Sequence, residues 1–199
     1  MPSEVIKRKD GTVEYYVKGK RHRLDGPAVQ YADGSFQYWI EGKLHRTEGP
    51  AIQRANGSFA YWVKGEIHRT DGPAIQNSDG SFQYWVKGQR HRTDGPAVQR
   101  EDGSIEYRIE GKLHRTDGPA VQWADDTIEY WIEGKPFTEA EFIQRYLEKE
   151  APSEISTFEK LDSILENLSV SESVKELLRI FLTPRVQEKI QSFWSHLGV

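Results

Sequence analysis

Hydrophobic and polar side chains alternate in short segments along the first two thirds of the chain. In residues 36–40, Phe-Gln-Tyr-Trp-Ile, aromatic and β-branched residues dominate, and Asp33-Gly34 and Glu41-Gly42 bracket the segment. Such a composition is typical of a β-strand. Asp-Gly supplies the positive φ that a tight hairpin turn requires, so residues 28–30 are the expected partner strand across the first turn. This part of the chain shows no 3.6-residue period, which argues against helices there.

The same alternation recurs with a fixed period of 23 residues. Full units occupy residues 15–37, 38–60, 61–83, 84–106 and 107–129, and partial units occupy residues 5–14 and 130–137. Uninterrupted copies at one period indicate a repeat architecture in which each unit packs on its neighbours. We therefore expect a mainly β repeat array over residues 1–136, a single-layer solenoid of antiparallel β-hairpins.

Alternation within the long strand assigns its side chains to two faces. Phe36, Tyr38 and Ile40 and their equivalents are large and apolar or tyrosine, which predicts the packed face of the sheet. The opposite face carries tryptophan between polar residues, and an arginine replaces the tryptophan in one unit. A fully buried column would not accept an unpaired arginine. We therefore predict a partly exposed aromatic stripe, which consists of Tyr16, Trp39, Trp62, Trp85, Arg108 and Trp131.

Two roles are open for this stripe. Exposed tryptophan and tyrosine dominate the hot spots of protein interfaces, so the stripe is a candidate partner-binding surface. Alternatively, each indole lies flat on a one-layer sheet and covers the backbone and the lysine stems of adjacent hairpins.

A second recurring motif, His-Arg-x-Asp-Gly-Pro-Ala, follows each of these strands. Proline has no amide donor and biases the preceding residue to an extended backbone, so the chain is expected to leave the sheet there. The acid can accept hydrogen bonds from the backbone amides of this corner and from histidine or arginine, which predicts a structural turn. The histidines and acids concerned are His22 and Asp25, His45 and Glu48, His68 and Asp71, His91 and Asp94, and His114 and Asp117.

The arginines of this motif form a ladder beside the acids. The alternative to a turn role is recognition of an anionic ligand, such as a nucleotide or a phosphoinositide headgroup. The ladder consists of Arg23, Arg46, Arg69, Arg92 and Arg115.

Metal binding and catalysis are not expected. One histidine and one acid per unit are too few ligands for a metal, and neighbouring units are expected roughly 10 Å apart. The recurring serines, such as Ser35, belong to the Asp-Gly-Ser turn at the other end of the hairpin, where no histidine can activate them. We therefore expect no catalytic residue, no metal and no cofactor.

The 23-residue period and the segment Trp-x-x-Gly-x-x-His, as at Trp39, Gly42 and His45, resemble MORN repeats. They also resemble the MORN-variant repeats of bacterial YwqK-type proteins. The resemblance covers residues 5–136, although Arg-x-Asp-Gly-Pro-Ala follows the histidine where typical MORN units have Gly-x-Gly. It implies an extended hairpin sheet that contacts proteins or phospholipids, a link to toxin–antitoxin systems, and no catalysis.

The period ends after residue 136. Residues 137–150 open with a capping box, Thr138 with Glu141, and a hydrophobic staple, Phe137 with Phe142. They predict a helix that caps the last hairpin. Residues 151–199 contain amphipathic stretches that predict a small helical bundle. About 45 residues are marginal for independent stability, so this bundle is expected to pack on the array, on a second copy or on a partner.

Composition narrows the function classes. The chain has 199 residues, a net charge of −4 and no cysteine, which excludes disulfides and thiol catalysis. Residues 1–136 contain 20 Lys/Arg and 20 Asp/Glu, so nucleic acid is not an expected partner and charge gives no support to membrane association. The start lacks an apolar signal-peptide core and no segment is long and apolar enough to span a membrane, which predicts a cytoplasmic protein.

These patterns together predict a non-enzymatic binding or scaffold protein. Its aromatic stripe would bind a protein partner, and its C-terminal helices would add a second contact or homo-oligomerisation surface. Inhibitor, antitoxin and immunity proteins have this character. The alternative is a receptor or sponge for a small anionic ligand held by the arginine ladder and the tryptophans.

Overall fold

The computed structural model describes residues 4–142 together with residues 145, 166 and 175. The described chain consists mostly of antiparallel β-strands and turns, with almost no helix. Within it, no helix has the length and apolarity needed to cross a membrane. The helical bundle predicted for residues 151–199 and most of the helix predicted for residues 137–150 lie outside the described residues.

The chain divides into two compact units. The first comprises Met1–His114 and Val121–Thr127, and the second comprises Arg115–Ala120 and Ile128–Val199. The first unit holds most of the repeats and is the larger part of the described chain.

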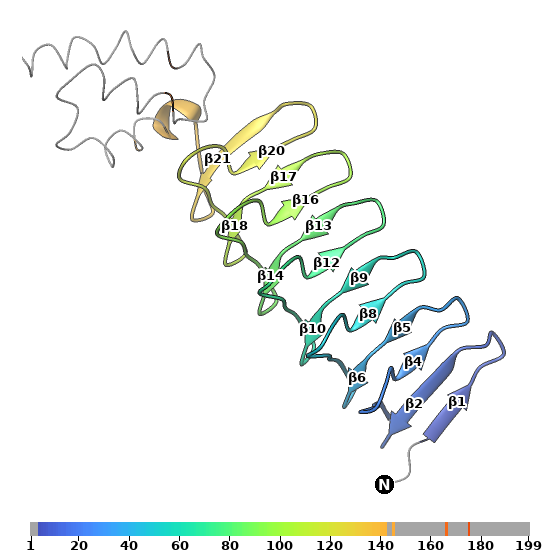
Figure 1. The fold of residues 1–199 in the computed structure, drawn as a ribbon. Helices are drawn as coiled ribbons and strands as arrows, with labels where there is room; N and C mark the ends of the chain where they lie inside the picture. Colours follow the sequence, from blue (N-terminus) through green and yellow to red (C-terminus); the bar gives the residue numbers. More distant parts are fainter. Residues whose placement is uncertain (1–3, 143–144, 146–165, 167–174, 176–199) are drawn as a thin grey trace, which may run out of the picture. The chain divides into compact units, whose positions relative to one another are not determined.

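The first unit is built on one continuous antiparallel sheet (Figure 1). Its first strands are β1 (Glu4–Lys7), β2 (Val13–Val17) and β3 (Lys20–Arg21). A two-residue strand then follows each Gly-Pro-Ala segment: β4 (Val29–Gln30), β8 (Ile52–Gln53), β12 (Ile75–Gln76), β16 (Val98–Gln99) and β20 (Val121–Gln122). Another follows each Asp-Gly or Asn-Gly turn: β5 (Phe36–Gln37), β9 (Phe59–Ala60), β13 (Phe82–Gln83) and β17 (Ile105–Glu106).

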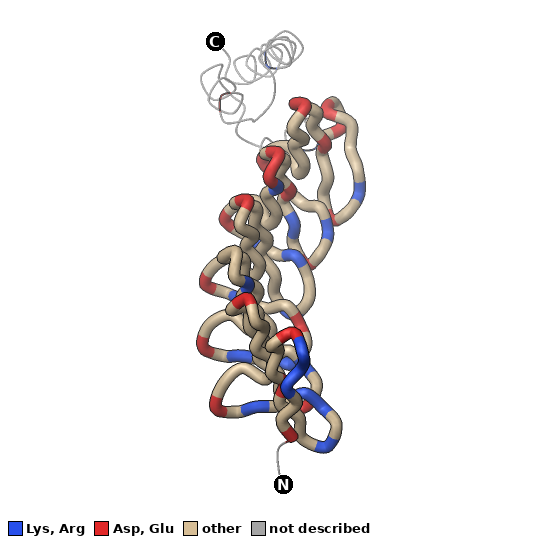
Figure 2. Tube along the Cα trace, turned by 90° about the vertical axis from the view of Figure 1, so that its right-hand side faces the viewer, with Lys and Arg blue, Asp and Glu red and all other residues tan. Residues whose placement is uncertain are grey.

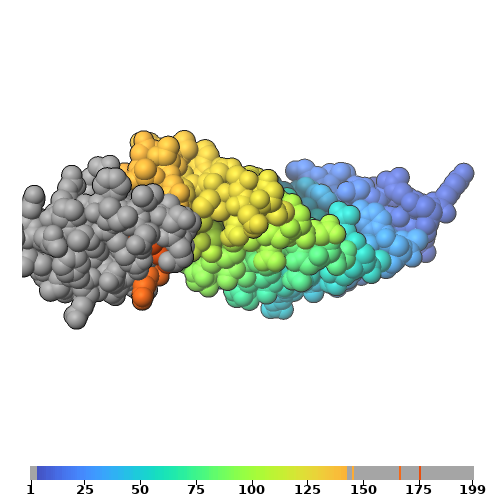
Figure 3. All heavy atoms as spheres, turned by 90° about the horizontal axis from the view of Figure 1, so that it is seen from above, coloured from blue at the N-terminus to red at the C-terminus, as the bar shows by residue number. Residues whose placement is uncertain are grey.

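The strand order within this sheet follows the chain. It is β1-β2-β4-β5-β8-β9-β12-β13-β16-β17-β20, with β3 paired to β2. Within a repeat β4 pairs with β5, and β5 pairs with β8 of the next repeat, where Phe36 lies opposite Gln53. Backbone hydrogen bonds therefore join consecutive repeats, which lie side by side in sequence order (Figure 3). The prediction of antiparallel β-hairpins is confirmed.

The long strand predicted over residues 36–40 is interrupted at Tyr38. Its N–H donates to the carbonyl of Ala51 in the same 23-residue unit (2.8 Å), and its carbonyl accepts from the N–H of His45 (3.1 Å). The tryptophan side of each interruption belongs to a small separate hairpin: β6 (Trp39–Ile40) with β7 (Lys43–Leu44), β10 (Trp62–Val63) with β11 (Glu66–Ile67), β14 (Trp85–Val86) with β15 (Gln89–Arg90), and β18 (Arg108–Ile109) with β19 (Lys112–Leu113). The prediction of one uninterrupted strand is wrong here, because its two halves pair with different partners.

The two faces of the sheet in the first unit are less distinct than predicted. Phe36, Tyr38, Ile40 and their equivalents there are all partly exposed. Buried side chains occur on both faces: Ala28 lies opposite Tyr15, and Val29 lies on the other face, opposite Glu14 and Gln37. The Val29 side is here called the tryptophan face because it carries Trp39, Trp62 and Trp85. A one-layer sheet has no second layer to cover the phenylalanines, so they pack edge-on against the tyrosines two residues on, with ring centroids 5.7 Å apart.

The alanine of each Gly-Pro-Ala segment is fully buried. Ala28, Ala51, Ala74 and Ala97 are 0% exposed, and each carbonyl accepts a hydrogen bond from the tyrosine N–H of the preceding strand at 2.8 Å. A small residue fits this position because the chain is hydrogen-bonded on both sides there; the N–H of Ala74, for example, donates to the carbonyl of Gln83 (2.9 Å).

The second unit contains β21 (Ile128–Ile132) and β22 (Lys135–Phe137), which form a hairpin. Residues 139–142 are helical. At the start of this turn, Thr138 N–H donates to Glu141 Oε2 (2.8 Å) and Glu141 N–H donates to Thr138 Oγ1 (3.3 Å), so the capping box predicted from sequence is formed. Phe142 packs on Tyr130 with ring centroids 4.6 Å apart.

Candidate partner-binding surface

Each His-Arg-x-Asp-Gly-Pro-Ala corner folds around its arginine. Arg92 Nε donates to Asp94 Oδ1 (2.8 Å), its Nη1 donates to the carbonyl of Pro96 (3.3 Å), and its guanidinium lies 4.1 Å from the ring centre of Tyr84. A Cβ on Gly95 would approach Cζ of Arg92 to 3.0 Å, which explains the glycine at this position. The corner is thus a closed network around a side chain that is only 22% exposed.

The same contacts recur in other repeats. Arg69 donates to Asp71 (2.8 Å) and to the carbonyl of Pro73 (3.2 Å). In the second unit Arg115 donates to Asp117 (2.8 Å). The pKa values of Asp25, Asp71, Asp94 and Asp117 lie below the ordinary value for aspartate. The main cause is the hydrogen bond that each carboxylate accepts from its arginine. Each arginine of the ladder therefore donates to the proline carbonyl of its own corner, and all but Arg46 also donate to the aspartate.

The second corner differs because its acid is Glu48. Arg46 still lies 4.0 Å from the ring centre of Tyr38 and donates to the carbonyl of Pro50 (3.2 Å). No hydrogen bond or ion pair joins Arg46 to Glu48 in the described chain. Gly49 has a φ of 102°, unlike the equivalent glycines of the other corners. The extra methylene of glutamate thus coincides with a different loop conformation.

The histidines of the motif connect neighbouring repeats. Nδ1 of His22 accepts a hydrogen bond from the backbone N–H of Glu41 (3.1 Å), the first residue of the next small hairpin turn. Equivalent bonds of 3.0–3.1 Å reach His45, His68 and His91. Because Nδ1 accepts, the proton of each neutral imidazole resides on Nε2. In the fifth corner the backbone N–H of His114 donates to the carbonyl of Tyr107 (3.1 Å).

The donors to these histidines all have left-handed backbone conformations. Glu41 has a φ of 52° and is followed by Gly42 with a φ of 78°, as a two-residue hairpin turn requires. The same geometry holds at the equivalent positions, Lys64, Lys87 and Glu110. Histidine therefore anchors a strained turn of the following repeat, which is a structural contact.

The indoles of the tryptophan face are held in fixed orientations. Trp39 Nε1 donates to Gln37 Oε1 (2.9 Å), and Trp85 Nε1 donates to Gln83 Oε1 (3.0 Å). Both indoles remain partly exposed. In the second unit Trp131, also partly exposed, donates to Glu129 Oε2 (2.7 Å). A glutamine or glutamate two residues before the tryptophan is thus the partner of the indole N–H.

Trp62 lacks this partner. Its Nε1 is buried without a hydrogen bond, and Ala60 stands where the other repeats have glutamine or glutamate. A buried donor without an acceptor lowers the stability of the folded state, so this repeat is expected to be less stable locally than its neighbours.

The remaining stripe positions hold polar groups. Tyr16 lies opposite Arg21 in the β2–β3 pair. Arg108 Nε donates to Glu106 Oε2 (2.5 Å) and its Nη1 donates to the carbonyl of Gly111 (2.7 Å). The arginine that replaces tryptophan is therefore paired.

Two buried glutamates lie on the tryptophan face, and sequence reasoning missed them. Glu14 binds Arg8 and Arg21, and Glu106 binds Arg100 and Arg108; the two acids are 2% and 3% exposed. Burial raises the pKa of each carboxyl, but the arginine hydrogen bonds outweigh it, so both pKa values lie below the ordinary value. The available signal was an acid at a position where other repeats carry glutamine or alanine.

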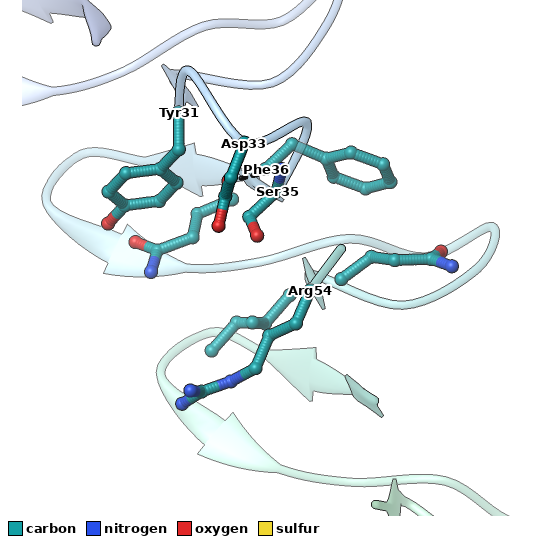
Figure 4. Close-up of a pocket in the computed structure, with 8 residues that line it drawn as sticks. Tyr31, Asp33, Ser35, Phe36 and Arg54 are labelled. Atoms are coloured by element: carbon teal, nitrogen blue, oxygen red, sulfur yellow. Dashed lines mark hydrogen bonds between the residues drawn. The ribbon is translucent and has the colours of Figure 1, made fainter. Parts of the chain in front are cut away.

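A shallow groove of about 260 Å³ lies between the β4–β5 hairpin and β8 (Figure 4). Tyr31, Asp33 and Arg54 line it, while the ring of Phe36 points away from them. Acidic and basic residues alternate along the chain of the repeats (Figure 2).

Among the described residues no group of three histidine, aspartate or glutamate side chains could hold a metal ion. Comparison with protein-family models gives no match, and comparison with curated protein sequences gives none either. The assignment of a function therefore rests on the geometry of the repeats.

Proposed function

We propose that this protein is a non-enzymatic binding protein that docks a protein partner on its tryptophan face. The supporting observation is the state of the indoles: Trp39 and Trp85 are partly exposed and each is fixed by a hydrogen bond from Nε1 to a glutamine. An aromatic side chain already held in one orientation loses little entropy on binding and gives a large contact area.

The repeats place these anchors at regular intervals. Because β5, β9 and β13 belong to one sheet with a constant register, the tryptophans that follow them recur once in each repeat. Regular anchors suit an extended segment or a broad face of a partner. The proposal includes a MORN-like solenoid arrangement of the repeats, and such a surface would serve an inhibitor, antitoxin or immunity protein.

The test is affinity capture from the native host with the tagged full-length chain. Variants that replace the tryptophan anchors are compared with variants on the opposite face. The test variant combines Trp39→Ala, Trp62→Ala and Trp85→Ala, and its control combines Phe36→Ala, Phe59→Ala and Phe82→Ala.

We expect the unmodified protein and the phenylalanine control to capture the same partner and the tryptophan variant to lose it. Thermal unfolding of each variant establishes that it is folded. If the triple tryptophan variant unfolds, Trp85→Phe, which keeps an aromatic ring but shortens the contact, replaces it. Full capture by a folded tryptophan variant would refute the proposal.

A further inference from the structure

Three arginines converge on one buried carboxylate in the fourth repeat. Glu106 accepts hydrogen bonds from Nη2 of Arg100 and from Nε of Arg108, the latter at 2.5 Å. These two partners occupy both carboxylate oxygens. Arg90, from β15, lies close enough for its charge to interact with all three of these groups.

The cluster contains donors without acceptors. Nε of Arg90 and Nη1 of Arg100 are buried and make no hydrogen bond. Three guanidinium groups thus share the one carboxylate of Glu106, so the cluster of these four side chains carries an excess of positive charge. Burial, and repulsion by Arg108 and Arg100 in part offset by Glu106, lower the pKa of Arg90.

The equivalent cluster at the start of the sheet has one arginine fewer. Glu14 is bound by Arg8 and Arg21, which occupy the repeat positions of Arg100 and Arg90. There Tyr16 occupies the position of Arg108, and no guanidinium nitrogen is buried without a partner among the described residues of that cluster. The same backbone arrangement thus holds two arginines around a glutamate without a buried unpaired nitrogen. Arg108 is the additional arginine in the fourth-repeat cluster.

The cluster lies partly at the surface, with its two unpaired nitrogens beneath the exposed parts of the side chains. The side chains of Arg100 and Arg108 are 37% and 21% exposed. Aromatic rings flank it, because Arg90 lies 5.1 Å from the ring centre of Trp85 and Arg100 lies 5.1 Å from that of Trp123. Such rings hold guanidinium groups in place and lower the entropy lost when a ligand binds.

We infer that Arg90, Arg100 and Arg108 form a binding site for an oxyanion, either a phosphate or a carboxylate group. Guanidinium groups bind both with paired hydrogen bonds, and a negative ligand offsets the excess positive charge. The site goes beyond the proposed docking function, because a free ligand or an acidic side chain of a partner would satisfy it equally.

The test uses the full-length protein at pH 7 and follows the arginine Nε–Hε signals in ¹H–¹⁵N NMR spectra. Sodium phosphate, sodium acetate and sodium chloride are titrated separately at matched ionic strength. We expect saturable shifts of the Arg90, Arg100 and Arg108 signals with phosphate, with acetate or with both, and only a small linear drift with chloride. Response to phosphate alone identifies a phosphate site, and response to acetate identifies a carboxylate site.

Repeat equivalents supply matched variants that should fold. Arg90→Leu introduces the residue found at the same position as Leu44 and Leu113, and it should weaken oxyanion binding by about tenfold. Glu106→Gln introduces the residue found as Gln37 and Gln83, and it should strengthen binding several-fold because it removes the competing carboxylate. Arg21→Leu is the control and should leave the affinity unchanged.

Shifts that do not saturate, or that match those caused by chloride, would overturn the site. Saturable shifts that persist unchanged in the Arg90→Leu variant would overturn it as well. Neither result depends on a protein partner, so failure of this site and failure of the proposed docking function are distinguishable.

Discussion

Nδ1 of His45 accepts a hydrogen bond from the backbone N–H of Lys64, 19 residues further along the chain, at 3.0 Å. This bond joins one repeat to the small hairpin turn of the next. Lys64 has a φ of 55°, so the histidine supports a backbone conformation that non-glycine residues seldom adopt. The histidine of the recurring motif thus connects adjacent repeats.

Removal of one such histidine should destabilise the array. His68→Ala leaves the N–H of Lys87 without its acceptor and should lower the free energy of unfolding by about 1 kcal/mol. His68→Asn places a carboxamide oxygen near the position of Nδ1 and should recover part of the loss. Urea unfolding followed by circular dichroism measures both; equal stability of the alanine variant and the unmodified protein would contradict the account.

Lysine should not replace the corner arginine. Arg69→Lys keeps the charge but loses the planar group that lies 4.1 Å from the ring centre of Tyr61 while donating to Asp71 and Pro73. We expect a loss of about 1 kcal/mol in the free energy of unfolding. An unchanged urea midpoint for this variant would mean that charge alone holds the corner.

A hydrogen-bond acceptor for the unpaired indole N–H of Trp62 should stabilise the protein. Ala60→Gln restores the acceptor that Gln37 and Gln83 provide in neighbouring repeats, and it should raise the free energy of unfolding by roughly 0.5–1.5 kcal/mol. The reverse change, Gln83→Ala, creates the same defect at Trp85 and should cost about 1–3 kcal/mol. If both substitutions shift the thermal midpoint in the same direction, the pairing is not the cause.

The two buried glutamates should make stability depend on acid pH. Their folded pKa values lie below the ordinary value of 4.5, so their contribution is fully present above that pH and is lost as pH falls through the folded values. Unfolding in urea at pH 7 and pH 3 should therefore show a smaller difference for the double variant Glu14→Gln, Glu106→Gln than for the unmodified protein. An identical pH dependence would assign the acid sensitivity to other groups.

Much of the fold could be predicted because its determinants are local. The Asp-Gly turns and the capping box of Thr138 each depend on residues a few positions apart, and the 23-residue period repeats the same local pattern. The hairpins and the first helical turn lie where these signals predict them. The strand break at Tyr38 was not predictable in this way. It depends on a hydrogen bond from Tyr38 to Ala51, which is distant in the sequence, and alternation assigns faces only within an uninterrupted strand.

The candidate site was predicted only in part for the same reason. Trp39 and Trp85 were identified from their spacing, but their partners could be assigned only after the register was known. The cluster around Glu106 combines Arg90 and Arg100 of the same repeat with Arg108 of the next, and no short motif joins these positions.

Site-specific photo-crosslinking tests the central claim, that a partner docks on the tryptophan face, most directly. The photoreactive residue p-benzoylphenylalanine replaces either Trp85 or Phe82, which lie close together in sequence but on opposite faces, and the captured complex is irradiated. The account predicts a covalent adduct with the partner from position 85 and none from position 82. An adduct from position 82 alone would contradict it.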